Sequence, residues 1–169
     1  RIASVTGAAK QVLQKLRPSD HFRLVLFSTN AISYPADRSF LVADPDTIAA
    51  ALDFITKTYV AEGGTNYEQA FLAGLSADFR ADSDRRLLFL TDGEPNIGKT
   101  TLADLMTVIN TADPSGVRIY PVLFYTNSIQ LLYDIAQARG GKAQNVERGD
   151  SLQTVISRLM FDLDIGGVS

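Results

Sequence analysis

Three short stretches of the sequence concentrate side chains that can bind a cation through oxygen atoms. They are Ser28–Asn30, Gly63–Asn66 and Thr91–Glu94, and they offer hydroxyl, carboxylate and amide oxygens. The chain has no cysteine and one histidine, His21, which excludes thiolate zinc sites, cysteine nucleophiles and metal sites built from several histidines. Metal chemistry here has to use oxygen ligands, which favours Mg²⁺ or Ca²⁺ over zinc or copper.

His21 follows Asp20 at the expected start of a strand, which raises the question of a Ser-His-Asp arrangement. No activated serine accompanies the pair, so we interpret His21 as lining a turn that leads from a loop into a strand. The sequence therefore points away from nucleophilic catalysis.

The segments that position the oxygen-rich stretches alternate between strand and helix patterns. Apolar runs predict strands at 22–27, 86–91 and 117–124, with shorter strands at 31–34 and 142–146. Apolar residues at helical spacing predict helices at 2–16, 46–57, 67–77, 101–111, 128–139 and 151–160. This alternation predicts one α/β domain with a Rossmann-like, doubly wound, mostly parallel sheet and helices on both faces. Ligands of such sheets bind beyond the carboxyl ends of the strands, where the oxygen-rich stretches lie.

Composition excludes several classes of protein. The chain has 169 residues, 46% of them hydrophobic, and a formal net charge of −3, so it can fill a core and is not a disordered chain. No apolar run approaches the roughly 18 residues that a membrane-spanning helix needs, and direct insertion into a membrane is not expected. The mildly acidic balance predicts no nucleic-acid partner.

Residues 93–100 also fit the phosphate-loop pattern G-x-x-x-x-G-K-[ST], with Gly93, Gly98, Lys99 and Thr100 at the defining positions. The pattern follows a strand and precedes a helix. A P-loop nucleotide-binding hydrolase that uses Gly93–Thr100 is therefore the alternative function. Against it, the pattern comes late in the chain, and no later strand ends in an aspartate suited to hold Mg²⁺.

The second and third oxygen-rich stretches together resemble a known family. Phe-Leu-Thr-Asp-Gly-Glu-Pro at 89–95 and Gly-Gly-Thr-Asn at 63–66 resemble the von Willebrand factor type A (VWA) domain, most closely the kind found in inter-alpha-trypsin inhibitor heavy chains. Residues 16–28 and 134–141 are similar to other parts of that domain in the same order. The resemblance covers essentially all 169 residues.

The resemblance implies a metal-ion-dependent adhesion site (MIDAS). In that family a divalent cation is held by hydroxyls and carboxylates, and an acidic side chain of the partner completes its coordination. The implied ligands in this chain are Thr65 and Asp92, with Ser28–Asn30 on the same rim, and the implied cation is Mg²⁺ or Ca²⁺, with Mn²⁺ as a further candidate. Mg²⁺ suits such a site because it prefers hard oxygens and keeps several waters that a ligand carboxylate can replace. We expect Glu94 and Lys99 to be solvated.

One part of the family pattern lies outside this sequence. The family's Asp-x-Ser-x-Ser loop follows its first strand and supplies three of the usual ligands; it would lie upstream of Arg1, and we expect it in a longer parent protein. Its strand would lie between 22–27 and 86–91, so those two segments should not pair directly. We assign residues 1–160 to a VWA domain without its first strand, and 161–169 to an exit strand that leads towards a following region.

The predicted function is binding rather than catalysis. The resemblance implies a metal-dependent module, of the adhesion type, in a larger secreted, periplasmic or cell-surface protein. The partner would be a protein or other macromolecule that offers an acidic side chain. With only two ligands from this chain, cation affinity should be weak until the upstream loop is present. A degenerate VWA spacer without metal binding is the remaining alternative.

Overall fold

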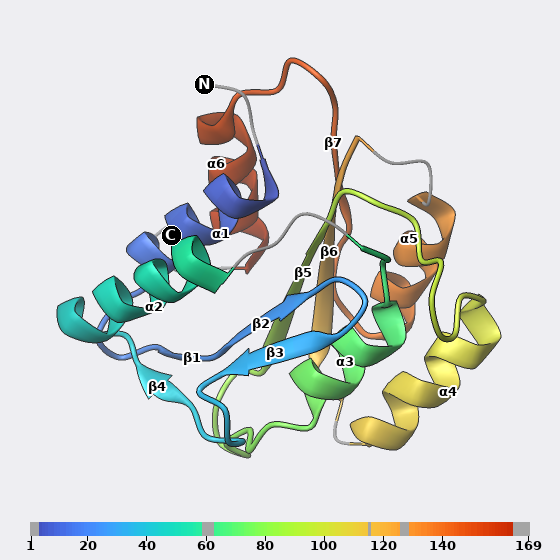
Figure 1. Cartoon of the computed structure of the whole chain (residues 1–169), viewed down its shortest axis with the longest axis horizontal. Helices are drawn as coiled ribbons and strands as arrows, with labels where there is room; N and C mark the ends of the chain where they lie inside the picture. Colours follow the sequence, from blue (N-terminus) through green and yellow to red (C-terminus); the bar gives the residue numbers. More distant parts are fainter. Residues whose placement is uncertain (1–3, 59–62, 115, 126–128, 164–169) are drawn as a thin grey trace.

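The computed structural model describes residues 4–58, 63–114, 116–125 and 129–163. Six helices and seven strands follow one another along this part of the chain. They are α1 (Val5–Lys15), β1 (His21–Phe22), β2 (Leu24–Phe27), β3 (Ala31–Tyr34), β4 (Leu41–Val42), α2 (Pro45–Thr58), α3 (Tyr67–Leu75), β5 (Arg86–Thr91), α4 (Leu102–Ala112), β6 (Arg118–Phe124), α5 (Ile129–Ala138), β7 (Gln144–Val146) and α6 (Leu152–Leu163). Figure 1 shows helices on both sides of the strands, as the alternating pattern predicts.

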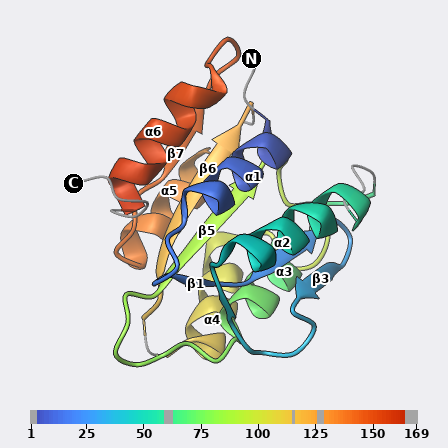
Figure 2. The same cartoon turned by 90° about the vertical axis from the view of Figure 1, so that its left-hand side faces the viewer.

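The parallel part of the sheet has the order β5-β6-β7, with β6 in the middle. Alternate residues of β6 enter two different cores, as expected for a strand covered on both faces. Tyr120, Val122 and Phe124 pack with α1 and α6, whereas Ile119 and Leu123 pack with α3, α4 and α5. Figure 2 shows α1 and α6 together on one side of these strands.

The predicted strand at 22–27 is two strands in the structure, which corrects the sequence interpretation. It divides at Arg23: β1 pairs with β4 through His21↔Val42 and Phe22↔Leu41, and β2 pairs with β3 in an antiparallel hairpin. The Nη1 atom of Arg23 donates to the carbonyl oxygens of Asp37 and Ser39, at 2.8 and 2.6 Å. The division therefore coincides with contacts to a loop distant in sequence.

β2 and β5 do not pair with each other. Among the described residues β2 bonds only to β3 and β5 only to β6, so this part of the chain forms three separate small sheets. This agrees with the expectation that 22–27 and 86–91 should not be direct neighbours.

The C-terminal prediction is wrong in its first three residues. Residues 161–163 were expected to begin an exit strand, but α6 continues to Leu163. Leu159, Met160 and Leu163 are buried at helical spacing and pack in the same core as α1. This packing of the apolar face favours a helix over a strand at 161–163. The rest of the predicted strand, 164–169, lies outside the described residues, and the boundary after residue 160 stays a prediction.

Candidate functional site

Thr65 and Asp92, the two residues that the resemblance implies as metal ligands, lie at the same open hollow. The hollow has a volume of about 450 Å³. It is lined by Thr65, Asp92, Gly93, Glu94, Pro95, Asn96 and Tyr125. Asp92 follows β5 directly, Tyr125 follows β6, and Thr65 lies just before α3, so the hollow is at the carboxyl edge of the parallel strands.

The loop that carries Thr65 is fastened to the end of β2. The backbone N–H of Asn66 donates to the Ser28 carbonyl oxygen at 2.9 Å, and its side-chain amide donates to the Thr29 carbonyl oxygen at 3.1 Å. The Thr29 hydroxyl accepts from the Gly64 N–H at 2.9 Å. The Asn66 side-chain oxygen also caps α3 by accepting from the Gln69 N–H at 3.0 Å. Residues 28–30 thus hold this loop and are not among those that line the hollow.

The loop after β5 holds Thr65 by hydrogen bonds to its backbone, on the side away from β2. The Asn96 side-chain oxygen accepts from the Thr65 N–H at 2.8 Å, and the Asn96 N–H donates to the Thr65 carbonyl oxygen at 2.9 Å. The Tyr67 hydroxyl donates to the Gly93 carbonyl oxygen at 2.6 Å. A Cβ placed on Gly93 would lie 3.2 Å from the Thr65 hydroxyl oxygen, so this hydroxyl faces the turn that carries Asp92.

The oxygens of Thr65 and Asp92 fit a hard cation as part of a site. Asp92 is exposed, and no described residue donates a hydrogen bond to its carboxylate. The Thr65 hydroxyl is likewise unbonded to any described residue, although its backbone is fixed on both sides. A hydroxyl and a carboxylate are ligands that Mg²⁺, Ca²⁺ and Mn²⁺ accept. Within the described ranges, no group of three His, Asp or Glu side chains gathers that could hold a metal ion.

The phosphate-loop alternative is not supported by the geometry of residues 93–100. A phosphate loop needs free backbone N–H groups that converge on an anion. Here the N–H groups of Asn96 and Ile97 donate to the Thr65 carbonyl oxygen, and the Lys99 N–H donates to the Glu68 carboxylate at 3.1 Å. Lys99 and Thr100 are exposed, and the following helix begins only at Leu102. These backbone N–H groups are thus already engaged within the chain and do not converge on a free anion site.

Two residues of the site escaped the sequence analysis. The sequence pattern includes Asn96 only as a variable position of the phosphate loop, although asparagine side chains in turns commonly hydrogen-bond to backbone groups. Tyr125 is the one described non-glycine residue with a positive φ, +59°. The guanidinium carbon of Arg148 lies 5.1 Å from the centroid of its ring. A bulky residue in this conformation is rare and marks a place where surrounding contacts determine the backbone.

His21 is placed as the sequence predicts and takes no part in the hollow. It is the first residue of β1, it is exposed, and it pairs with Val42. Glu94 and Lys99 are both exposed, as expected, and Glu94 lines the hollow. No described helix is long and apolar enough to cross a membrane.

Comparison with known proteins places the chain among heavy-chain relatives and VWA structures. It is 27% identical to human inter-alpha-trypsin inhibitor heavy chain H4 in an alignment 161 positions long that covers 89% of this chain and 17% of that protein. It is 25% identical to human heavy chain H1, over 98% of this chain and 20% of that protein. The chain therefore spans about a fifth or less of these relatives.

Solved structures show the same fold. A von Willebrand factor type A protein from Catenulispora acidiphila superposes with a TM-score of 0.76 at 21% identity, over 90% of this chain and 35% of that one. An aerotolerance-related membrane protein from Bacteroides fragilis superposes with a TM-score of 0.63 at 14% identity, over 94% of this chain and 88% of that one. The family model of the von Willebrand factor type A domain matches residues 1–158. The chain belongs to the von Willebrand factor type A domain family.

Proposed function

We propose that this chain is a divalent-metal-dependent binding module, with its cation held at the hollow between Thr65 and Asp92. The observation that carries the proposal is the meeting of these two side chains at one open site, each with oxygens that no described residue engages. A cation there offsets the charge of Asp92 and supplies an open coordination position for a carboxylate. The partner is therefore a protein or other macromolecule that offers an acidic side chain.

The chain's own residues supply rigidity rather than a complete set of ligands. Asn96 and Ser28 fix the backbone on either side of Thr65. Cation binding therefore costs little conformational entropy of this loop. Two ligands hold a hard cation only weakly, because affinity follows ligand number and charge. The remaining ligands are proposed to come from a loop upstream of Arg1 in the parent protein, as the resemblance implies.

The proposed role is recognition without catalysis, in a larger secreted, periplasmic or cell-surface protein. The heavy-chain relatives support the recognition role, and the Bacteroides fragilis membrane protein supports a place in the cell envelope. The fold of this chain supports a compact binding module, because its hollow is open and lined by fixed loops.

A titration of the ¹⁵N-labelled chain with Mn²⁺ tests the proposal, because a bound Mn²⁺ broadens the amide signals of its neighbours. We expect residues 64–66 and 92–96 to broaden first. Asp92→Asn and Thr65→Val should each weaken the response about tenfold or more, since each removes a ligand. Glu94→Gln is the matched control: it removes one charge from the same hollow but no proposed ligand.

Three results would contradict the proposal. One is broadening centred elsewhere on the chain, and another is an equal loss in Asp92→Asn and Glu94→Gln. The third is no response up to millimolar Mn²⁺, the range of weak extracellular cation sites. If the response is still absent when the upstream loop is restored, the domain is a spacer without metal binding.

A further inference from the structure

A turn next to the hollow is fixed by its own hydrogen bonds. Residues 147–150 form this turn between β7 and α6, and we call it the rim turn. Because β6 and β7 are parallel, the rim turn lies at the same edge of the sheet as Tyr125, which follows β6 (Figure 1). The Asp150 carboxylate accepts from the Glu147 N–H at 2.9 Å, and the Asp150 N–H donates to the Glu147 carbonyl oxygen at 3.1 Å. Gly149 has a φ of +97°, a conformation that glycine adopts without strain.

The rim turn holds Arg148 over the ring of Tyr125, and Tyr125 lines the hollow. The 5.1 Å between the guanidinium carbon and the ring centroid is within the range of a cation–π interaction. The backbone of Tyr125 is also joined to β7, because its N–H donates to the Val146 carbonyl oxygen at 3.1 Å. The two segments that carry the ring and the guanidinium are therefore bonded to each other. This arrangement places a positive charge beside the hollow in a defined position.

The guanidinium of Arg148 is available to a ligand. Arg148 is exposed, and no described residue forms an ion pair or a hydrogen bond with its side chain. The neighbouring Arg158 differs in this respect, since it pairs with Asp150 at 3.8 Å. A guanidinium carries five N–H donors in one plane, and a cation–π contact with a ring uses none of them. Arg148 can therefore bind a carboxylate through two parallel hydrogen bonds without leaving Tyr125.

The hollow itself has no positive group for an acidic partner. Asp92 and Glu94 line it, and none of its described lining residues is basic. A bound cation offsets one of these charges, and any further acidic group that enters the hollow meets the other. Arg148 lies outside the lining, beside Tyr125, so it serves a carboxylate other than the one on the cation.

We propose that Arg148 is a specificity-determining residue of this module, which binds the second of two carboxylates on an acidic peptide segment. The first carboxylate completes the coordination of the cation, a role that rests on the proposed function. The partner is thereby narrowed to a protein segment with two acidic side chains close together in its sequence. Tyr125 is a positioning residue, because it holds the guanidinium at the rim before the segment arrives and so reduces the entropy lost on binding.

Two synthetic peptides test this inference on the ¹⁵N-labelled chain. One consists of six glutamates and offers every spacing between two carboxylates; the other has one glutamate among five glutamines. The Nε–H signals of the arginines are followed by NMR at low salt and mildly acidic pH, first in EDTA and then in excess Mg²⁺. Arg38 and Arg80 are internal controls, because they are exposed but already paired with Asp78 and Asp82 at 3.3 and 3.5 Å.

In EDTA the six-glutamate peptide should shift the Nε–H signal of Arg148 further than those of Arg38 and Arg80. In Mg²⁺ it should also shift the backbone amides of 64–66 and 92–96. Arg148→Gln should weaken the binding of this peptide about fivefold, the upper range for an exposed ion pair, and leave the affinity of the one-glutamate peptide nearly unchanged. Lys99→Gln is the matched control: it removes the same charge from an exposed residue of the loop after β5, and both affinities should stay nearly unchanged.

The inference is wrong if Arg148 responds no more than Arg38 and Arg80 do, or if Arg148→Gln and Lys99→Gln weaken binding equally. It is also wrong if Arg148→Gln weakens both peptides to the same degree, because Arg148 would then serve the first carboxylate. Failure of the metal proposal gives a different result. In that case Arg148 responds in EDTA, and Mg²⁺ adds no shift at 64–66 or 92–96.

Discussion

Loss of the Arg139 guanidinium should destabilise the domain far more than loss of an equivalent surface arginine. Arg139 and Asp113 form an ion pair whose side chains are 6% and 5% exposed. Arg139 also donates from Nε to the Val117 carbonyl oxygen at 3.2 Å and from Nη1 to the Asp113 carbonyl oxygen at 3.3 Å. The pair thereby joins the ends of α4 and α5 to the start of β6.

The size of the effect follows from what Arg139→Met leaves behind. Removing one partner of a buried pair costs about 3–5 kcal/mol, because the other charge stays buried. Two backbone N–H groups, of Gly116 and Val117, still donate to the Asp113 carboxylate at 3.1 and 2.6 Å. We therefore expect the lower end, about 3 kcal/mol, which corresponds to a Tm lowered by about 6–12 °C in a domain of this size.

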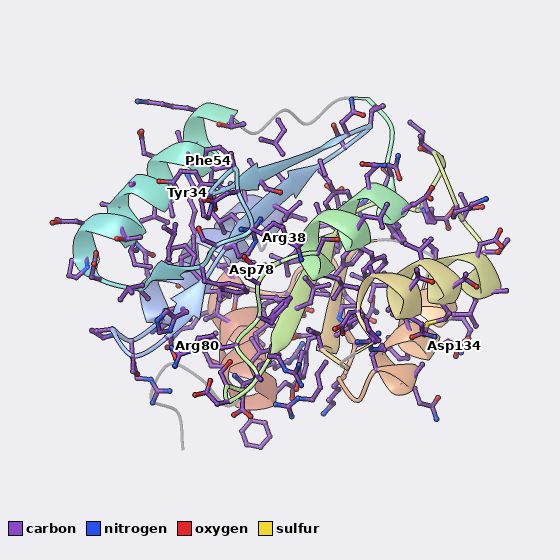
Figure 3. All side chains as sticks on the ribbon, turned by 90° about the horizontal axis from the view of Figure 1, so that it is seen from below. Tyr34, Arg38, Phe54, Asp78, Arg80 and Asp134 are labelled. Atoms are coloured by element: carbon purple, nitrogen blue, oxygen red, sulfur yellow. The ribbon has the colours of Figure 1, made fainter. Side chains whose placement is uncertain are left out.

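Thermal unfolding followed by circular dichroism measures this change, with Arg38→Met as the matched control. Figure 3 shows Arg38 and Asp78 near each other. They pair at 3.3 Å with side chains that are 67% and 68% exposed, so the control should cost about 0.5 kcal/mol. The double variant Arg139→Met, Asp113→Asn should recover part of the loss, since no charge stays buried and the asparagine oxygen still accepts from the Gly116 and Val117 N–H groups. If Arg139→Met lowers the Tm no more than Arg38→Met does, the assignment of this pair as a structural anchor is wrong.

Two further predictions concern the site and a helix cap. Asn96→Ala removes the acceptor for the Thr65 N–H and should weaken Mn²⁺ binding about tenfold, with little change in Tm. Asn96→Asp keeps an acceptor and should bind Mn²⁺ as tightly as wild type does. Equal Mn²⁺ affinities in wild type and Asn96→Ala would show that the Asn96 hydrogen bond does not position Thr65. Asp44 caps α2, and the hydrogen bond from the Thr47 N–H lowers the pKa of the Asp44 carboxyl from its ordinary value of 3.8. The charged cap therefore stabilises the fold fully above pH 3.8, and this stabilisation is lost as the pH falls through the folded-state pKa. The Tm advantage of wild type over Asp44→Asn should therefore shrink below about pH 3.8, and an advantage independent of pH would contradict the role of the charged cap.

Strand and helix types could be predicted from local patterns, but some boundaries could not. The run at 86–91 is a strand with the predicted bounds, because an apolar run of this length suits a position covered on both faces. The run at 22–27 divides at Arg23, where the pairing partner changes from β4 to β3 and the Arg23 side chain contacts loop carbonyls, and a linear pattern reveals neither. At 161–163 the apolar residues fit a strand and a helix equally well, and packing of Leu163 in the core shared with α1 decides for the helix.

The candidate site was predictable as a place, and only partly as a set of contacts. Residues that follow parallel strands must meet at one edge of the sheet, so the encounter of Thr65 with Asp92 followed from the expected topology. The hydrogen bond from the Thr65 N–H to Asn96 and the positive φ of Tyr125 depend on how separate loops approach each other. No periodicity in the sequence encodes such an approach, and a physical prediction of it requires the fold.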